Sequence, residues 1–250
     1  GVIAIKTYKT AQVARVVGVH PNTVRLYEEL ALIPKPERAE NGYRIFHDLH
    51  IEMMKLARIA FQIEVMQNGL RKKIVHMVKT AAAGDFESAL SLTDEYLLQV
   101  RREQKNAREA INIAKQILSG HSVSRSLRLT RKEAAKLLTI SMDTLRNWEM
   151  NGLLTVKRME NGYRIYAAED IDRLKIIRSL RCANYSLEAI LHMLSVLSDD
   201  PDADIEAALD TPKPDHEIIS VYDKLLTSLR EAEQNAMTMR EMLRNMKQKF

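Results

Sequence analysis

The sequence predicts a mainly α-helical protein built from one unit that occurs twice. The hexapeptide Glu-Asn-Gly-Tyr-Arg-Ile stands at residues 40–45 and again at residues 160–165, in a chain of 250 residues. The composition is rich in helix-forming residues and only 5% aromatic, which favours helix over sheet. Two copies at this long period are too few for a solenoid, so we interpret them as two domains, each with its own core.

Each copy begins with two short helices joined by a tight link. Thr10 and Thr130 are placed to cap the first helix, and Thr130 opens the capping-box sequence Thr-Arg-Lys-Glu. Gly18 suits the left-handed end of that helix. Pro21 fits the first position of the next helix, and Ser141 can cap its counterpart. This pattern predicts a helix-turn-helix in each half.

A β-hairpin is predicted next in each copy. Asn-Gly at 41–42 and at 161–162 is a strong hairpin signal, because both residues tolerate the positive φ of a type I′ turn. The hexapeptide then forms the tip of a two-stranded wing, with Arg44 and Arg164 beside it. The predicted strands flank these turns at residues 32–38, 43–46, 154–158 and 163–166.

Helical apolar spacing continues beyond each wing, at residues 49–60 and 171–180, and a further helix opens at Ser186. Each copy then closes with a long heptad pattern. In the first copy eight of ten heptad positions are apolar, and in the second all ten are, which predicts a coiled-coil seam. These positions are 86, 90, 93, 97, 100, 104, 107, 111, 114 and 118, then 218, 222, 225, 229, 232, 236, 239, 243, 246 and 250. The methionines of the second helix are expected in the seam, namely Met237, Met239, Met242 and Met246.

The predicted organisation is therefore two winged helix-turn-helix domains and two coiled-coil helices. The expected boundaries are 1–80 for the first winged domain, 85–118 for the first long helix, 119–126 for a linker, 127–198 for the second winged domain, 199–215 for an acidic proline-containing segment, and 216–250 for the second long helix. The acidic segment is either a solvated linker or a regulatory, partner-binding insert.

Several classes of function are disfavoured by the residues present. Cys182 is the sole cysteine and is expected to be a small buried residue, so disulfides within the chain and cysteine metal clusters are excluded. His47 and His50 lie three apart without further ligands, which favours a surface or capping role. The segment from Asp200 resembles a calcium loop but has Ile205 where glycine is required. We expect no enzyme activity, cofactor, metal or membrane span, and a cytoplasmic location.

Each half resembles the MerR (mercury-resistance-regulator) family. The residues that carry the resemblance are Thr23 to Glu28 with Asn41 to Phe46, and Thr144 to Glu149 with Asn161 to Tyr166. Members of the family usually carry one such unit per chain and dimerise through an antiparallel coiled coil. They bind a pseudo-palindromic promoter with an overlong spacer and activate it by distorting the DNA. The resemblance thus implies double-stranded DNA as partner, with RNA polymerase at the promoter and a small-molecule effector as further candidates.

Two units in one chain open two alternatives for assembly. The eight-residue linker reaches roughly 28 Å when extended, whereas a long helix of this length spans roughly 48 Å. The chain can therefore pass to a neighbouring domain but cannot return along the helix. The two seams can pair within one chain as an intrachain pseudo-dimer, and a homodimer that pairs first half with second half is the main alternative.

The second helix of each helix-turn-helix is expected to enter the major groove. The base-edge candidates are His20, Asn22, Thr23, Arg25, Ser141, Asp143, Thr144 and Arg146. The resemblance assigns phosphate contact to Tyr27, Tyr43, Arg44, Trp148, Tyr163 and Arg164, with support from Lys35, Arg38, Lys157 and Arg158. The alternative is that both wing tyrosines cover the core and both wing arginines are merely solvated. The net charge of +5 agrees with a polyanionic partner.

The sequence thus predicts a DNA-binding transcription regulator that binds and distorts a promoter pseudo-palindrome. Two other functions use the same fold. One is a protein that binds or sequesters a small apolar, drug-like ligand between the winged domains and the coiled coil. The other is a nucleoid-shaping protein with little sequence preference, whose specificity ratio over random DNA would be near unity.

Overall fold

The structure is a computed structural model that describes residues 4–62, 69–121, 125–197 and 214–250. The chain divides into two compact units, to each of which both long helices contribute one half. Unit 1 comprises Gly1–Glu64, Gly69–Arg101 and Arg230–Phe250, and unit 2 comprises Val65–Asn68 and Arg102–Leu229. The acidic segment 199–215 lies largely outside the described residues, as do positions 122–124 of the linker, so the expectations about them stay predictions.

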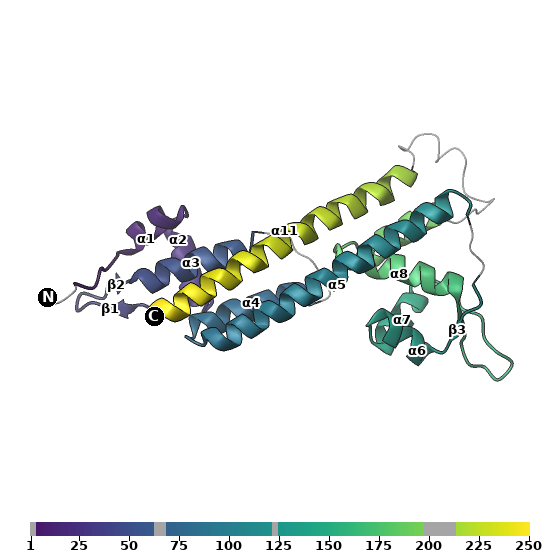
Figure 1. Cartoon of the computed structure of the whole chain (residues 1–250), viewed down its shortest axis with the longest axis horizontal. Helices are drawn as coiled ribbons and strands as arrows, with labels where there is room; N and C mark the ends of the chain where they lie inside the picture. The colour runs from purple at the N-terminus through teal and green to yellow at the C-terminus, as the bar shows by residue number, and fades with distance from the viewer. Residues whose placement is uncertain (1–3, 63–68, 122–124, 198–213) are drawn as a thin grey trace. The chain divides into compact units, whose positions relative to one another are not determined.

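Helices dominate both units, as the sequence predicts (Figure 1). The elements that contribute to unit 1 are α1 (Thr10–Val17), α2 (Pro21–Glu29), β1 (Glu37–Arg38), β2 (Arg44–Ile45), α3 (Asp48–Ala60), α4 (Leu70–Ala82), the first half of α5 (Phe86–Leu118) and the second half of α11 (Pro214–Lys249). Unit 2 holds β3 (Arg128–Leu129), α6 (Arg131–Leu138), α7 (Met142–Met150), β4 (Tyr166–Ala167), α8 (Ala168–Cys182), α9 (Leu187–Leu197) and the remaining halves of α5 and α11.

The caps of the helix-turn-helix mostly follow the sequence. Gly18 ends α1 with φ of 77°, a conformation that glycine adopts without strain. Thr130 caps α6 in a capping box in which its N–H donates to Glu133 at 2.8 Å. The predicted cap of α1 was wrong: Thr10 is the first helical residue, and Lys9 is the cap. The side chain of Gln12 accepts from the N–H of Lys9 at 2.7 Å, which is the role of the third-position Glu or Gln in a capping box.

The wing tip differs from the predicted type I′ turn. In the first copy the N–H of Gly42 donates to Ala39 O at 2.8 Å, and the N–H of Ala39 donates to Tyr43 O at 2.9 Å. Gly42 has φ of 81°, whereas Asn41 is not among the positive-φ residues. The loop therefore has three residues, with glycine in the left-handed position of a bulge. The side chain of Asn41 instead accepts from the N–H of Tyr43 at 3.2 Å. The Asn-Gly sequence alone does not distinguish this three-residue loop from a type I′ turn.

Each wing also pairs with the segment before the first helix, a contact that the sequence analysis missed. In unit 1 the N–H of Tyr8 donates to Phe46 O at 2.8 Å. In unit 2 β3 pairs antiparallel with β4, with Leu129 opposite Tyr166. The predicted strands of the second wing pair only at the Arg158–Arg164 bridge, within the residues that the structure describes.

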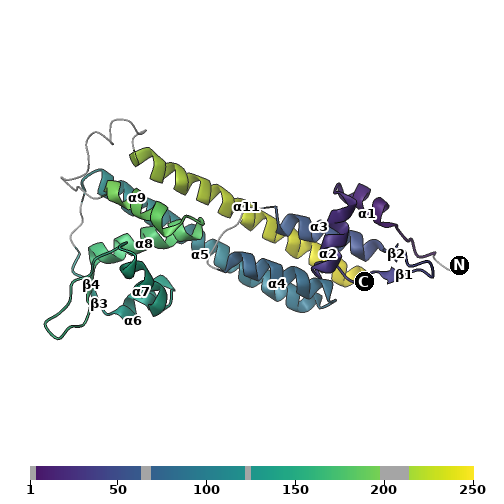
Figure 2. The same ribbon diagram turned by 180° about the vertical axis from the view of Figure 1, so that it is seen from behind.

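The two long helices pack antiparallel within each unit (Figure 2). In unit 1, Arg240 of α11 donates to Asp94 of α5 at 3.2 Å, and Arg101 donates to Glu233 at 3.1 Å. In unit 2, Gln104 donates to the carbonyl of Leu229 at 3.2 Å, so this polar seam residue has a partner. Residues further along α5 therefore contact residues earlier in α11, which confirms the antiparallel coiled coil.

The seam is buried where the heptads predict it. On α11 nine of the ten predicted positions are buried, and only Phe250 at the end is exposed. On α5 the central seven predicted positions are buried and the end positions 86, 90 and 118 are half-buried. Met239 and Met246 lie in the seam, and Met242 is half-buried, but Met237 is 41% exposed, so its predicted seam packing was wrong.

A second buried stripe runs along α5 at seven-residue spacing through Ala89, Tyr96, Glu103 and Ala110. This stripe is not apparent from the sequence, because Glu103 interrupts its apolar pattern. In unit 2 this face meets α8: Arg178 donates through both Nη atoms to the carboxylate of Glu103, at 2.8 and 2.9 Å. Arg178 Nε also donates to the carbonyl of Leu138, at the end of α6, at 2.6 Å. One buried ion pair thus joins α5, α6 and α8.

His50 is buried and caps the N-terminus of α3 through the backbone of His47, which fits the capping role predicted for the histidine pair. Its Nδ1 accepts from the backbone N–H of His47 at 2.9 Å, and its side chain is 6% exposed. Burial lowers the pKa of His50 below its usual 6.5, and the charge of His47 lowers it further. Hydrogen bonding with the backbone of His47 and Pro34, and then the charge of Glu37, raise the pKa by smaller amounts.

This burial predicts a loss of stability in acid. Below about pH 6.5 the unfolded chain binds a proton at position 50 before the folded chain does, so the free energy of unfolding falls as the pH falls. We expect His50→Asn to reduce the drop in thermal midpoint between about pH 7 and pH 5, because asparagine keeps the acceptor and does not titrate. The exposed His76 of α4 provides the control: His76→Asn should leave that drop unchanged. An equal drop in wild type and His50→Asn would contradict this role for His50.

Candidate nucleic-acid interface

The second helix of each helix-turn-helix presents one face to the core and the other to solvent. α2 and α7 are both nine residues long, and Val24 and Leu145 are fully buried at matching places. The next residue of each helix is an exposed arginine, Arg25 in α2 and Arg146 in α7. Because a helix that enters a groove must expose polar side chains over its outer face, both helices suit this role.

A glutamate at the same place on α2 and α7 holds the arginine of the wing. In unit 1, Nε of Arg44 donates to Glu28, and Arg38 lies 3.6 Å from the same carboxylate. In unit 2, Nε of Arg164 lies 3.2 Å from Glu149. The glutamate side chains are only 9% and 6% exposed. Because a buried carboxylate requires partners, each wing is fixed against its own helix.

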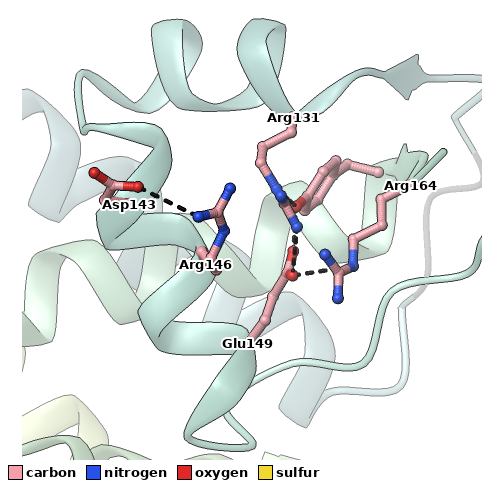
Figure 3. A network of polar contacts seen from close by, with 6 residues as sticks. Arg131, Asp143, Arg146, Glu149 and Arg164 are labelled. Carbon is pink, nitrogen blue, oxygen red and sulfur yellow. Dashed lines mark hydrogen bonds and ion pairs between the residues drawn. The ribbon is translucent and has the colours of Figure 1, made fainter.

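Unit 2 adds further partners to this glutamate (Figure 3). Glu149 also accepts from Arg131 at 3.1 Å, and the hydroxyl of Tyr166 donates to it. Burial, and then the hydrogen bond to Glu149, raise the pKa of Tyr166 to about 12, so that this phenol stays neutral and donates. Figure 3 shows Arg131 and Arg164 both reaching the carboxylate of Glu149, while Asp143 and Arg146 form a separate pair on α7. In the first copy Phe46 occupies the place of Tyr166, and no third donor reaches Glu28 among the described residues.

The exposure of the wing residues contradicts the alternative in which the wing tyrosines cover the core. Tyr43 and Tyr163 are each 73% exposed, so neither ring covers a core. The arginines next to them are half-buried and paired, which means that they are not freely solvated either. Each unit therefore presents one exposed aromatic ring and one oriented guanidinium on consecutive residues of the wing.

The burial of Trp148 contradicts the prediction that its side chain contacts a phosphate. Its side chain is 4% exposed, whereas Tyr27 at the matching place is half-buried and meets Phe61 edge-on, with ring centroids 6.3 Å apart. The indole is larger and more apolar than the phenol, so it packs into the core of unit 2. We therefore correct this prediction: Trp148 is a core residue.

The other predicted contact residues lie at least partly at the surface. Two of them also cap their helix: His20 Nδ1 accepts from the N–H of Asn22 at 3.2 Å, and Ser141 accepts from the N–H of Thr144 at 3.0 Å. The exposed residues are His20, Asn22, Arg25, Lys35, Arg38, Tyr43, Ser141, Asp143, Arg146, Lys157, Arg158 and Tyr163, and the half-buried ones are Thr23, Tyr27, Arg44, Thr144 and Arg164.

The sequence analysis missed the glutamates that orient the wings. The signal was present, because Glu28 and Glu149 close the two matching hexapeptides on α2 and α7. Arg131 was missed as well, since its partner Glu149 is distant in sequence. Across the described ranges, no group of three or more His, Cys, Asp or Glu side chains is arranged to hold a metal ion. Among the described helices, none combines the length and apolar character needed to span a membrane.

Comparison with known proteins agrees with this geometry in both halves. The family model described as "MerR family regulatory protein" matches residues 9–46, and the one described as "MerR HTH family regulatory protein" matches residues 129–197. These ranges contain the helix-turn-helix and the wing of each unit. No solved structure matches the chain.

Curated relatives are similar over part of their length. HTH-type transcriptional regulator ZntR of Escherichia coli K12 is 38% identical over 68 residues, which is 27% of this chain and 48% of the relative. A probable heavy metal-dependent transcriptional regulator of Haemophilus influenzae Rd is 40% identical over 70 residues, 28% of this chain and 54% of the relative. HTH-type transcriptional regulator CueR of E. coli O157:H7 is 38% identical over 53 residues, 21% of this chain and 39% of the relative. The chain thus spans about half or less of the relatives' length. Each half nevertheless matches a MerR-family model, so the chain carries two MerR-type units in tandem.

Proposed function

We propose that this protein is a transcription regulator that binds double-stranded promoter DNA through both winged helix-turn-helix units. One observation carries the proposal: in each unit a wing arginine is paired with a glutamate of the outward-facing helix, beside an exposed wing tyrosine. A guanidinium held in this way donates in a fixed direction, and its half-exposed position lets a phosphate replace or share the carboxylate.

The contacts divide into two classes. The exposed side chains on the first turns of α2 and α7 would meet base edges, whereas the wing residues would meet phosphates. Phosphate contacts position the protein, and base contacts select the sequence. Because the exposed residues of α2 and α7 differ, the two half-sites would differ, and the operator would be an asymmetric version of a palindrome.

The pairing of α5 with α11 within one chain supports an intrachain pseudo-dimer. Each unit already contains an antiparallel pair of these helices, which is the place that a second chain would otherwise occupy. In this proposal one chain occupies one operator, distorts the promoter, and acts in the cytoplasm with RNA polymerase and a small-molecule effector as candidate partners.

Light scattering of the protein alone and on its selected duplex tests this stoichiometry. We expect the mass of one chain at all concentrations in the free state, and of one chain plus one duplex in the complex. The reason is that the heptad seams of both long helices are already buried within the chain. A free mass that rises to two chains with concentration, or two chains on one duplex, would instead support the homodimer.

A further inference from the structure

α2 and α7 differ in one matched side chain at the position where a base would be read. Asn22 and Asp143 are both the second residue of their helix, and an exposed arginine follows three residues later, Arg25 or Arg146. The two helices have equal length, and a side chain caps the N-terminus of each, so these positions are comparable.

In unit 1 the amide of Asn22 has a defined orientation. Arg25 Nη1 donates to Asn22 Oδ1 at 2.7 Å. A guanidinium has only donors, so the amide must turn its oxygen toward the arginine. The amide nitrogen of Asn22, with two hydrogens, is then turned away from the arginine and has the larger hydrogen-bonding capacity left for DNA. Asn22 therefore offers donors to a base edge.

In unit 2 the matching group offers only acceptors. The side chain of Asp143 is 90% exposed, and Nη1 of Arg146 lies 3.7 Å from its Oδ1, beyond hydrogen-bond distance (Figure 3). An ionised carboxylate has two acceptor oxygens and no donor. It is also repelled by the DNA backbone, so it is tolerated in a groove only where a base amino group meets it.

We propose that Asn22 and Asp143 give the two half-sites opposite hydrogen-bonding character where these side chains meet a base. Asp143 selects an amino-bearing base, with cytosine N4 preferred and adenine N6 second. Asn22 selects an acceptor edge, guanine N7 and O6 or thymine O4. The inference rests on the proposed DNA binding, and it identifies one residue pair that makes the operator asymmetric. Arg25 and Arg146 are common to both helices and cannot produce this difference.

Reciprocal exchange tests the inference by selection from duplexes with random sequence. We expect Asn22→Asp to convert one position of the α2 half-site from guanine or thymine to cytosine or adenine, by about tenfold in relative affinity. Asp143→Asn should produce the reverse change in the α7 half-site alone. The variant with both exchanges should invert the character of both positions. Asn245→Asp, which adds the same charge on an exposed position of α11, should leave both preferences unchanged.

Two results would overturn the inference, and they are distinguishable. If the wild-type protein selects an operator but neither exchange alters a base preference, the assignment of Asn22 and Asp143 is wrong while DNA binding stands. If the wild-type protein selects no duplex at all, the proposed function fails and the assignment fails with it.

Discussion

Replacing Glu103 with alanine is expected to lower the free energy of unfolding by about 3–5 kcal/mol, because it leaves a buried arginine without its counterion. Arg178 is 8% exposed and Glu103 is 3% exposed, so water cannot solvate the remaining charge. The carbonyl of Leu138 would still accept from Nε of Arg178, but neither Nη atom would keep its carboxylate. Urea unfolding, followed through the fluorescence of Trp148 in the core of unit 2, measures this loss.

A second ion pair between the same two helices is the matched control. Lys175 of α8 donates to Glu109 of α5 at 2.5 Å, but Glu109 is 45% exposed. Glu109→Ala should therefore cost only about 0–1 kcal/mol. Replacing both buried partners, Glu103→Leu with Arg178→Met, should restore most of the lost stability, since burial without charge avoids the desolvation penalty. If Glu103→Ala costs no more than Glu109→Ala, the buried pair does not stabilise the unit.

The two units differ at this contact, although their sequences are related. Asn235 of α11 stands at the heptad position that Glu103 occupies on α5, and it donates to Gln62 at 3.3 Å. Arg58 of α3, at the place of Arg178, is exposed. A neutral hydrogen bond contributes about 0.5–1.5 kcal/mol, so the equivalent contact in unit 1 is expected to be weaker. We therefore expect this contact to hold α8 to α5 in unit 2 more firmly than its counterpart holds the end of α3 to α11 in unit 1.

The parts of the fold that depend on local sequence were predictable. Gly18, Thr130 and Ser141 fix helix ends through their own backbone and side chains, so neighbouring residues suffice to identify them. The α11 seam was also predictable, because heptad spacing states which face is buried. The repeat located both wings, since the tips at 41–42 and 161–162 are identical in sequence and in hydrogen bonding.

The features that were missed depend on partners distant in sequence. Tyr8 pairs with Phe46, and Glu103 pairs with Arg178, and no local pattern contains both members of either pair. The burial of Trp148 was missed because alignment with Tyr27 assumed equal environments. The resemblance suggested the wing arginines as contacts, but only the structure reveals that Glu28 and Glu149 orient them.

Replacing both wing arginines with alanine should weaken DNA binding about 100-fold, because each charge-assisted hydrogen bond to a phosphate contributes about 1.5 kcal/mol or more. The loss should be uniform across sequences, since phosphates carry no sequence information. The slope of log affinity against log salt concentration should also fall by about two units, one for each lost contact. Fluorescence anisotropy with a selected duplex and with a random one, each at several salt concentrations, measures both effects for Arg44→Ala with Arg164→Ala.

A charge-matched variant separates phosphate contact from a change in net charge. Arg108→Ala with Arg244→Ala removes one exposed arginine from the long-helix part of each unit, and neither residue belongs to a wing. Screening confines the influence of such charges to about 8–10 Å, so this variant should bind within about twofold of wild type.

An apolar ligand, if the protein binds one, should be retained by both double variants, because the wings are outside the coiled coil. Equal affinity and equal salt slope in the wing variant and the wild type would exclude the wing arginines as phosphate contacts. That result would favour the ligand-binding alternative, because Glu28 and Glu149 would then orient their arginines for the stability of the wing alone.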